Sequence, residues 1–220
     1  KLQKIPKQLD YDFWCGPSQV LPYMRARHHR WWRGHSAYGG GVLMDWIGHH
    51  NDIAHWALDL DSSGPEEVEA IGWTFPKMDI YDTPVRYTIR CKYAGGVSST
   101  ISSENAAGLE LIGTEGSVFV NRGKLQTSDP RWAKSDFVPG PAKVTVSDDH
   151  MGNFLSCIRT RQEAIAPAEA GHRSITPGHL GYVSSALGRS LRWDAKEERV
   201  VGDEEADNKL RHFEYRQPWS

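Results

Sequence analysis

Apolar residues recur at helical spacing in three segments of the chain. The first segment, Val42 to Leu58, has apolar residues every three or four positions and predicts a helix. The second, over 150–161, predicts a shorter amphipathic helix. Proline is favoured in the first turn of a helix, so Thr176-Pro177 is expected to open a third helix that runs to about Trp193.

Between the first two helices the pattern changes to the alternation of strands. Five strands are predicted, over residues 67–75, 85–93, 97–104, 110–113 and 117–121. The turn signals Ala94-Gly95-Gly96 and Gly113-Thr114-Glu115-Gly116 each join two of them into a hairpin. Consecutive hairpins imply a largely antiparallel sheet. Residues 126–147 are polar and are expected to form a surface excursion.

Helices are expected to cover only one face of this sheet. Aromatic and aliphatic residues occur at both parities along the strands, so the uncovered face is expected to be apolar. A large exposed apolar patch marks an interface, and a two-fold contact between two sheets would bury it. The sequence therefore predicts a homo-oligomer, unless residues 122–147 fold back over the sheet and leave a monomer.

Residues 1–40 keep no period and are interrupted by Pro6, Gly16-Pro17 and Pro22. Irregular segments of this length are usually functional, so an arm on the substrate side is expected. Six of the ten His and five of the nine Trp lie before residue 57. Since Trp faces stack on sugar rings and His exchanges protons near neutral pH, the cluster favours a sugar site over isolated core positions.

Composition excludes several classes of function. Hydrophobic residues make up 39% of the 220 and charged residues 25%, which is ordinary for a globular domain. A net charge of -2 gives no reason to expect nucleic acid or an anionic membrane as the main partner, and the basic run Arg25 to Arg33 is the local exception. Three cysteines lie far apart, which suggests neither a disulfide framework nor a zinc site.

No apolar stretch approaches the roughly 18 residues of a transmembrane helix. The N-terminus, Lys1 to Pro6, has no signal-peptide pattern and no initiator Met, so the chain is expected to begin within a longer protein. Cytoplasmic and periplasmic locations both remain open.

The candidate chemistry lies in the helix over 42–58. Asp45 and His49 are four residues apart and share a face of that helix. A carboxylate beside an imidazole fixes its tautomer and raises its basicity, so the pair could exchange a proton with a substrate hydroxyl. Alternatives are a solvated surface contact and a metal site; no HExxH spacing occurs, and no metal is predicted.

The stretch from Tyr38 to Trp56 resembles the signature GGG-x-x-x-D-x-G-x-H-x-x-D-x-x-x-W, which opens the C-terminal domain of Gfo/Idh/MocA oxidoreductases. One departure is Ile47, where the family has Gly. Further segments resemble later landmarks of the family: Trp14 to Pro17 with Pro22-Tyr23, Gly64 to Ala70, Tyr81 to Pro84, Gly113 to Gly116, His150 to Arg159, Gly188 to Asp194, and Arg216 to Trp219. The resemblance covers nearly the whole chain.

The resemblance implies an α+β fold over residues 1–220, with an open, mainly antiparallel sheet, helices packed on one face and a free face that often forms the subunit interface. It implies NAD(P)-dependent oxidation of a sugar or cyclitol hydroxyl, or the reverse reduction. Asp45 and His49 take the family's catalytic positions, and Trp32, Arg33 and His50 are expected to line the same cleft and bind substrate. NAD or NADP would be bound mainly by an N-terminal dinucleotide-binding domain.

That domain is missing from this sequence, because no GxGxxG follows a strand and no Glu-Lys-Pro occurs. The chain is therefore expected to be inactive alone, and its cofactor-binding residues are unknown. Two other functions remain open: a noncatalytic sugar-binding or oligomerisation module, and an NAD-dependent glycosidase or lyase on the same scaffold. The Tyr-Pro-x-His string of the glycosidase branch is absent.

Overall fold

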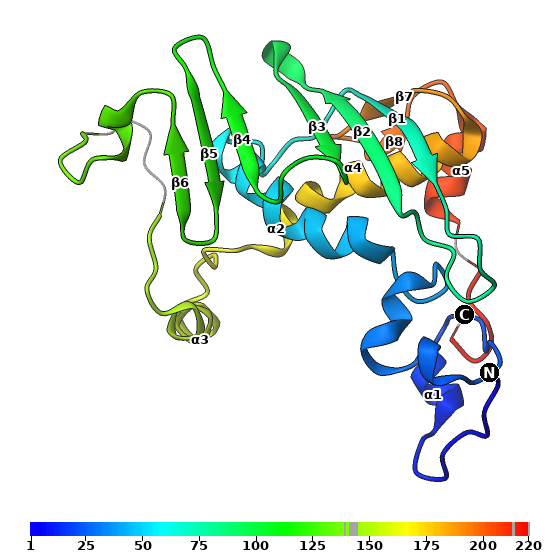
Figure 1. The fold of residues 1–220 in the computed structure, drawn as a ribbon. Coiled ribbons are helices and arrows are strands. Elements are labelled where there is room, and N and C mark those ends of the chain that lie inside the picture. Colours follow the sequence, from blue (N-terminus) through cyan, green and yellow to red (C-terminus); the bar gives the residue numbers. More distant parts are fainter. Residues whose placement is uncertain (139, 141–144, 213, 220) are drawn as a thin grey trace. The chain divides into compact units, whose positions relative to one another are not determined.

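The computed structural model describes residues 1–138, 140, 145–212 and 214–219 (Figure 1). The chain divides into two compact units. Unit 1 comprises Lys1–Ile47, Gly64–Asn105 and Thr176–Ser220; unit 2 comprises Gly48–Ser63 and Ala106–Ile175. Two helices, α2 (Gly41–Ala57) and α4 (Ala168–Leu187), contribute residues to both units.

Unit 1 is built on a five-stranded sheet with the order β3-β2-β1-β7-β8. Its strands are β1 (Glu67–Thr74), β2 (Arg86–Lys92), β3 (Ser98–Ser102), β7 (Leu191–Asp194) and β8 (Arg199–Val200). Every neighbouring pair is antiparallel. The hairpin predicted at Ala94 to Gly96 is confirmed: it joins β2 to β3, and both of its glycines have positive φ.

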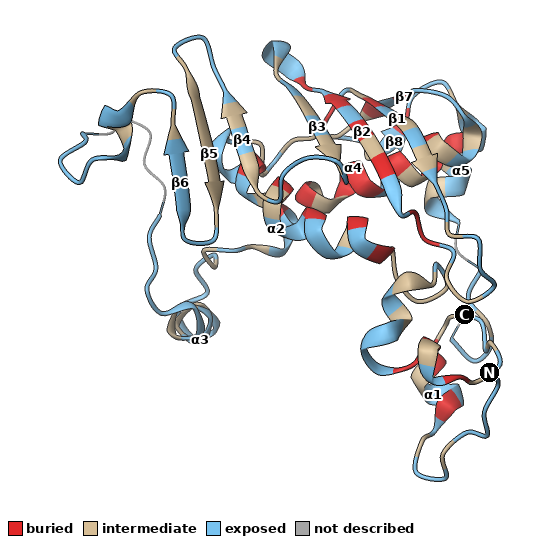
Figure 2. Cartoon of the chain, in the orientation of Figure 1, coloured by how far each residue is buried: buried red, intermediate tan, exposed pale blue. Residues whose placement is uncertain are grey.

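Helix α4 packs on one face of this sheet (Figure 1). The close approach is made at Gly181, where an added Cβ would lie 2.9 Å from Ile89 Cγ1. One residue later, the Tyr182 ring meets the Trp73 ring edge-on at 5.0 Å. The alternating burial of β2 follows from this contact, because every second side chain of a strand points to the same face (Figure 2).

The opposite face of this sheet is mostly polar, with Ile71 as an apolar member opposite Thr88, so the large apolar surface expected there was wrong for unit 1. The apolar side chains Tyr87, Ile89 and Cys91 all belong to the buried parity of β2. The other parity and its cross-strand partners supply charged and hydroxyl groups, among them Glu67, Glu69, Thr88, Arg90, Lys92, Ser98 and Thr100. Association through this face stays a prediction, but an exposed apolar patch no longer supports it.

Unit 2 holds a second, three-stranded antiparallel sheet, with the order β4-β5-β6. Its strands are β4 (Leu109–Ile112), β5 (Ser117–Asn121) and β6 (Lys124–Thr127), and the predicted turn at Gly113 to Gly116 joins the first two. The helix predicted over 150–161 is confirmed as α3 (His150–Thr160), and Asp149 caps its start. All five predicted strands are therefore present, divided between two sheets.

The structure differs from the elements predicted from the sequence in four places. The predicted surface excursion begins with strand β6 and a short 3-10 turn, η4 (Pro130–Ala133), while residues 139 and 141–144 lie outside the described part. Helix α4 begins at Ala168 and holds Pro177 inside it. It ends at Leu187, because Gly188 takes φ +66°, so Leu191–Asp194 is strand β7 instead of helix. Helix α5 (Glu204–Arg211), in the acidic tail, was not predicted.

The expected irregular arm contains one helix, α1 (Tyr11–Cys15), and two 3-10 turns, η1 (Arg25–Arg27) and η2 (His29–Gly34). Across the part of the chain that the structure describes, no helix is long and apolar enough to cross a membrane.

Candidate active site

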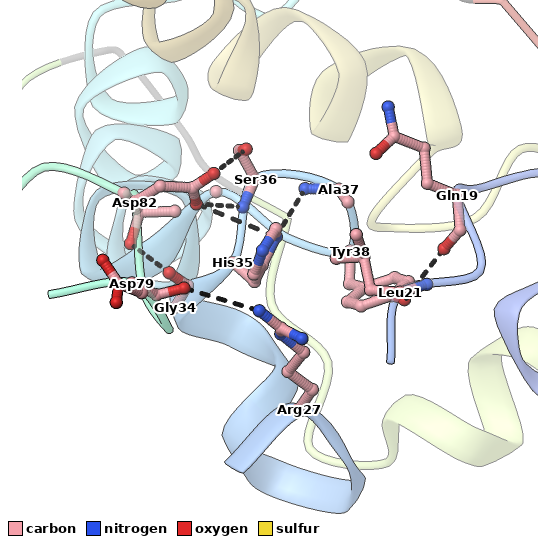
Figure 3. Close-up of polar contacts among 12 residues, drawn as sticks. Gln19, Leu21, Arg27, Gly34, His35, Ser36, Ala37, Tyr38, Asp79 and Asp82 are labelled. Atoms are coloured by element: carbon pink, nitrogen blue, oxygen red, sulfur yellow. Dashed lines mark hydrogen bonds and ion pairs between the residues drawn. The ribbon is translucent and has the colours of Figure 1, made fainter. Parts of the chain in front are cut away.

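The arm of unit 1 is packed around aromatic rings. Tyr11 stacks on Trp14 with ring centroids 5.6 Å apart, and Trp14 meets Tyr38 edge-on at 5.2 Å. The Tyr38 hydroxyl donates to Gln19 O at 2.9 Å and accepts from Leu21 N at 3.3 Å (Figure 3). Although it has little regular structure, this arm therefore has a core of its own.

The C-terminal tail holds the same arm. The Arg216 guanidinium donates to Ser18 O at 2.9 Å and to Asp12 O at 2.7 Å, and it also pairs with the Asp12 carboxylate at 2.9 Å. These bonds join segments that are about two hundred residues apart in the sequence. The closing Arg-x-Pro-Trp segment is thus bound to the arm through its arginine.

The glycine run is the link from the arm to α2. At Gly39 an added Cβ would lie 2.8 Å from the Trp32 ring. Gly41 has φ +64°, and an added Cβ there would meet Thr83 Oγ1 and lie 2.6 Å from Thr83 Cβ. Both positions therefore require glycine, one to let an indole ring approach and the other to turn the backbone into the helix.

This turn brings the arm against the start of α2. Arg33 Nε lies 3.4 Å from Asp45 Oδ1, and the Arg33 guanidinium also lies over the Trp32 ring, 5.6 Å from its centroid. The side chains of Arg33 and Asp45 are 52% and 40% exposed, so both remain open to solvent. An aromatic plane, a guanidinium and a carboxylate thus form one exposed cluster in unit 1.

The exposed side of α2 continues beyond Asp45. Its buried positions are Leu43, Ile47, Asn51, Ala54 and His55, and its exposed positions include Asp45, Trp46, His49, Ile53 and Trp56. Asp45 and His49 are both exposed, and that they face a common cleft stays a prediction. The division between the units falls after Ile47, so His49 and His50 belong to unit 2.

Within unit 2, buried Asn51 fixes this part of α2, because its amide donates to Ser174 O at 2.7 Å. His50 is half-buried, and burial, followed by the nearby His49 and Arg122, lowers its pKa below the usual value. It is therefore held in the neutral form near pH 7, with both a donor and an acceptor nitrogen.

Of the five predicted site residues, the structure brings Trp32, Arg33 and Asp45 together and leaves His49 and His50 in the next turn of the same helix. Their catalytic and binding roles stay predictions. Within the described ranges, no three His, Cys, Asp or Glu side chains are grouped as metal ligands would be.

Two residues near this cluster had no role in the sequence reasoning. Asp82 and Ser36 join the loop before β2 to the arm (Figure 3). The signal available for Asp82 was its place in Tyr81-Asp82-Thr83-Pro84, a polar turn between two strands. Nothing in the sequence linked that turn to the arm more than forty residues earlier.

Comparison with known proteins decides the family. Residues 1–220 match the model for the oxidoreductase family's C-terminal alpha/beta domain. The chain belongs to the Gfo/Idh/MocA oxidoreductase family. Its membership confirms the resemblance drawn from the glycine run and the Asp45 motif, and it covers the entire sequence.

Two solved structures share the Gfo/Idh/MocA C-terminal fold of this chain. An NAD-binding protein from Listeria innocua is 17% identical, with a TM-score of 0.51 over 73% of this chain and 50% of that one. The WlbA dehydrogenase from Bordetella pertussis, solved with NADH and UDP-GlcNAcA, is 19% identical, with a TM-score of 0.51 over 74% and 48%. The match thus spans about half the length of each relative. No curated protein matches the sequence.

The nicotinamide cofactor of these relatives does not fit the residues described here. A dinucleotide site of the Rossmann type needs parallel strands with a glycine-rich turn into a helix. Both sheets in the described part of this chain pair only antiparallel. The described residues therefore do not form a dinucleotide site of the Rossmann type.

Proposed function

We propose that this chain is the substrate-binding and acid/base half of an NAD(P)-dependent oxidoreductase acting on a sugar or cyclitol hydroxyl. The observation that carries the proposal is the cluster of Trp32, Arg33 and Asp45 at the start of α2, in a chain that belongs to an oxidoreductase family. The nucleotide would be bound mainly by a separate dinucleotide-binding domain.

The cluster has the groups that proton transfer to or from a hydroxyl needs. Asp45 carries a carboxylate, and its Oδ1 lies 3.4 Å from Nε of the Arg33 guanidinium. An ionised carboxylate can accept a hydroxyl proton, and His49, one turn further along α2, can relay it.

Trp32, Arg33 and His50 suit the remainder of a sugar. A Trp face packs against sugar C–H groups, and the guanidinium has donors beyond those that face Asp45. His50 offers one donor and one acceptor when neutral, the form that burial favours. The proposal thus assigns binding to the arm and His50 and proton transfer to Asp45 and His49.

Turnover by the complete protein, with the domain joined to its dinucleotide-binding half, tests the proposal. A panel of sugars and cyclitols is supplied with NAD or NADP, and reduced nicotinamide is followed by its absorbance. Asp45→Asn and His49→Asn are each expected to lower kcat by about 10²–10⁴-fold, the contribution of a positioned acid or base. Trp32→Ala and Arg33→Ala are expected to raise KM.

Asp59→Asn is the matched control, because Asp59 is exposed just beyond α2 and has φ +56°, which Asn tolerates. It is expected to turn over like the wild type. Asp45→Asn and His49→Asn variants that bind sugar and retain wild-type kcat would instead favour a noncatalytic sugar-binding module. Cleavage of a glycosidic bond without net nicotinamide reduction would favour a lyase or glycosidase.

A further inference from the structure

We propose that Asp82 is a positioning residue that holds Arg33 and Trp32 of the arm against Asp45. The inference rests on the proposed function for its kinetic consequence but not for its geometry. All the groups involved belong to unit 1.

The Asp82 carboxylate accepts two hydrogen bonds from the arm directly after η2 (Figure 3). Its Oδ1 accepts from Ser36 N at 2.6 Å, and its Oδ2 accepts from Ser36 Oγ at 2.6 Å. The Asp82 backbone N–H donates to Gly34 O at 3.1 Å. His35, between these two residues, places Nδ1 3.9 Å from Oδ1. Asp82 therefore bonds to two positions of the arm, Gly34 and Ser36, while His35 Nδ1 accepts from Ala37 N at 3.2 Å.

The next residue, Thr83, contacts both the arm and the start of α2. Thr83 Oγ1 donates to Gly34 O at 3.1 Å, and its backbone N–H points to the same oxygen at 3.4 Å. Thr83 is only 6% exposed and lies against Gly41, the first residue of α2. The arm and the helix thus meet on one short segment, Asp82-Thr83.

The two partners of the ion pair are close to these anchor points in the sequence. Arg33 immediately precedes Gly34, and Asp45 lies about one helical turn after Gly41. An exposed ion pair contributes only about 0–1 kcal/mol, too little to fix the distance between two chain segments. Asp82 and Thr83 together make several hydrogen bonds to Gly34 and Ser36, on the stretch of backbone that follows Arg33, and these bonds set the position of Arg33.

The test compares Asp82→Ala and Ser36→Ala with the control Asp79→Ala in the complete protein. Asp79 is an exposed acid of the same loop, and its backbone carbonyl, which the substitution leaves in place, accepts from Arg27. Hydrogen exchange followed by mass spectrometry reports on the arm without any substrate. In Asp82→Ala, amides over 34–41 are expected to exchange about tenfold faster, with a smaller change in Ser36→Ala and none in the control.

Kinetics give the second readout. Asp82→Ala is expected to lower kcat/KM about 10–100-fold by raising KM, because it displaces the binding groups Trp32 and Arg33, with a smaller loss in Ser36→Ala. Asp82→Ala combined with Arg33→Ala is expected to lose little beyond Arg33→Ala alone, because both changes act through Arg33.

The two proposals fail in different ways. Wild-type exchange over 34–41 in both Asp82→Ala and Ser36→Ala overturns the positioning role, whatever the activity. Faster exchange with unchanged KM, in a protein whose KM is raised by Arg33→Ala, also overturns it. Unchanged kcat in Asp45→Asn itself overturns the proposed function, while the exchange result still decides whether Asp82 holds the arm.

Discussion

Replacing Gly41 by alanine should destabilise unit 1 in two ways. The residue has φ +64°, where a side chain costs about 1–2 kcal/mol. Its new Cβ would also lie 2.6 Å from Thr83 Cβ, and Thr83 is buried and tied to Gly34, so it cannot swing away. Overpacking of this kind costs about 1–3 kcal/mol. The expected loss in free energy of unfolding is therefore about 2–5 kcal/mol.

Gly188→Ala separates the two causes. Gly188 has a matching φ of +66°, belongs to the same unit, and has no atom within 4 Å of an added Cβ. It should lose only the backbone contribution of about 1–2 kcal/mol. Urea unfolding followed by tryptophan fluorescence measures both, and Tm should fall by roughly 2–4 °C for each kcal/mol. Equal losses in the two variants would refute the claim that Thr83 blocks the site.

Two further predictions concern α4 and the histidines. Ser184→Ala should lower the free energy of unfolding in urea by about 1–3 kcal/mol, because buried Ser184 Oγ accepts from Ala70 N at 3.0 Å and donates to Arg189 O at 2.7 Å. Ser98→Ala, at an exposed position, is the control, and equal stability of the two variants would contradict this role of Ser184. Burial, the largest cause in each case, lowers the pKa of His28, His35 and His55, so the unfolded chain binds protons first as pH falls below about 6.5. The free energy of unfolding should thus be highest above that pH and decline from pH 7 to pH 5, and a flat profile would count against it.

Local sequence patterns predicted the elements in which the apolar spacing and the turn residues indicate the same structure. The helical period of 42–58 and the glycine turns after β2 and β4 fixed one helix and two hairpins to within about two residues. The segment after Gly188 was misassigned, because Leu191 and Trp193 continue the apolar spacing of α4. Only the positive φ of Gly188 separates the helix from β7, and that conformation is a property of the folded chain.

The candidate site was only partly accessible from the sequence for a similar reason. The spacing of Asp45 and His49 follows from helix geometry, so the sequence could predict it. The pair of Arg33 with Asp45 depends on how the arm folds back through Gly39 and Gly41. That fold in turn depends on Asp82, a contact over 46 residues that no local pattern reports.

The polar face of the five-stranded sheet has a consequence for how the chain folds. Across β1 and β2, Glu67 is paired with Lys92, with 3.0 Å between Oε1 and Nζ, and Glu69 lies opposite Arg90. Slipping one strand by a single residue would turn Arg90 and Lys92 toward α4 and bring Ile89 into water. Exposing that isoleucine alone would cost about 1.5–3 kcal/mol, before any cost of burying two cations. The alternation of charged and apolar positions therefore favours a single register between β1 and β2 while the sheet assembles.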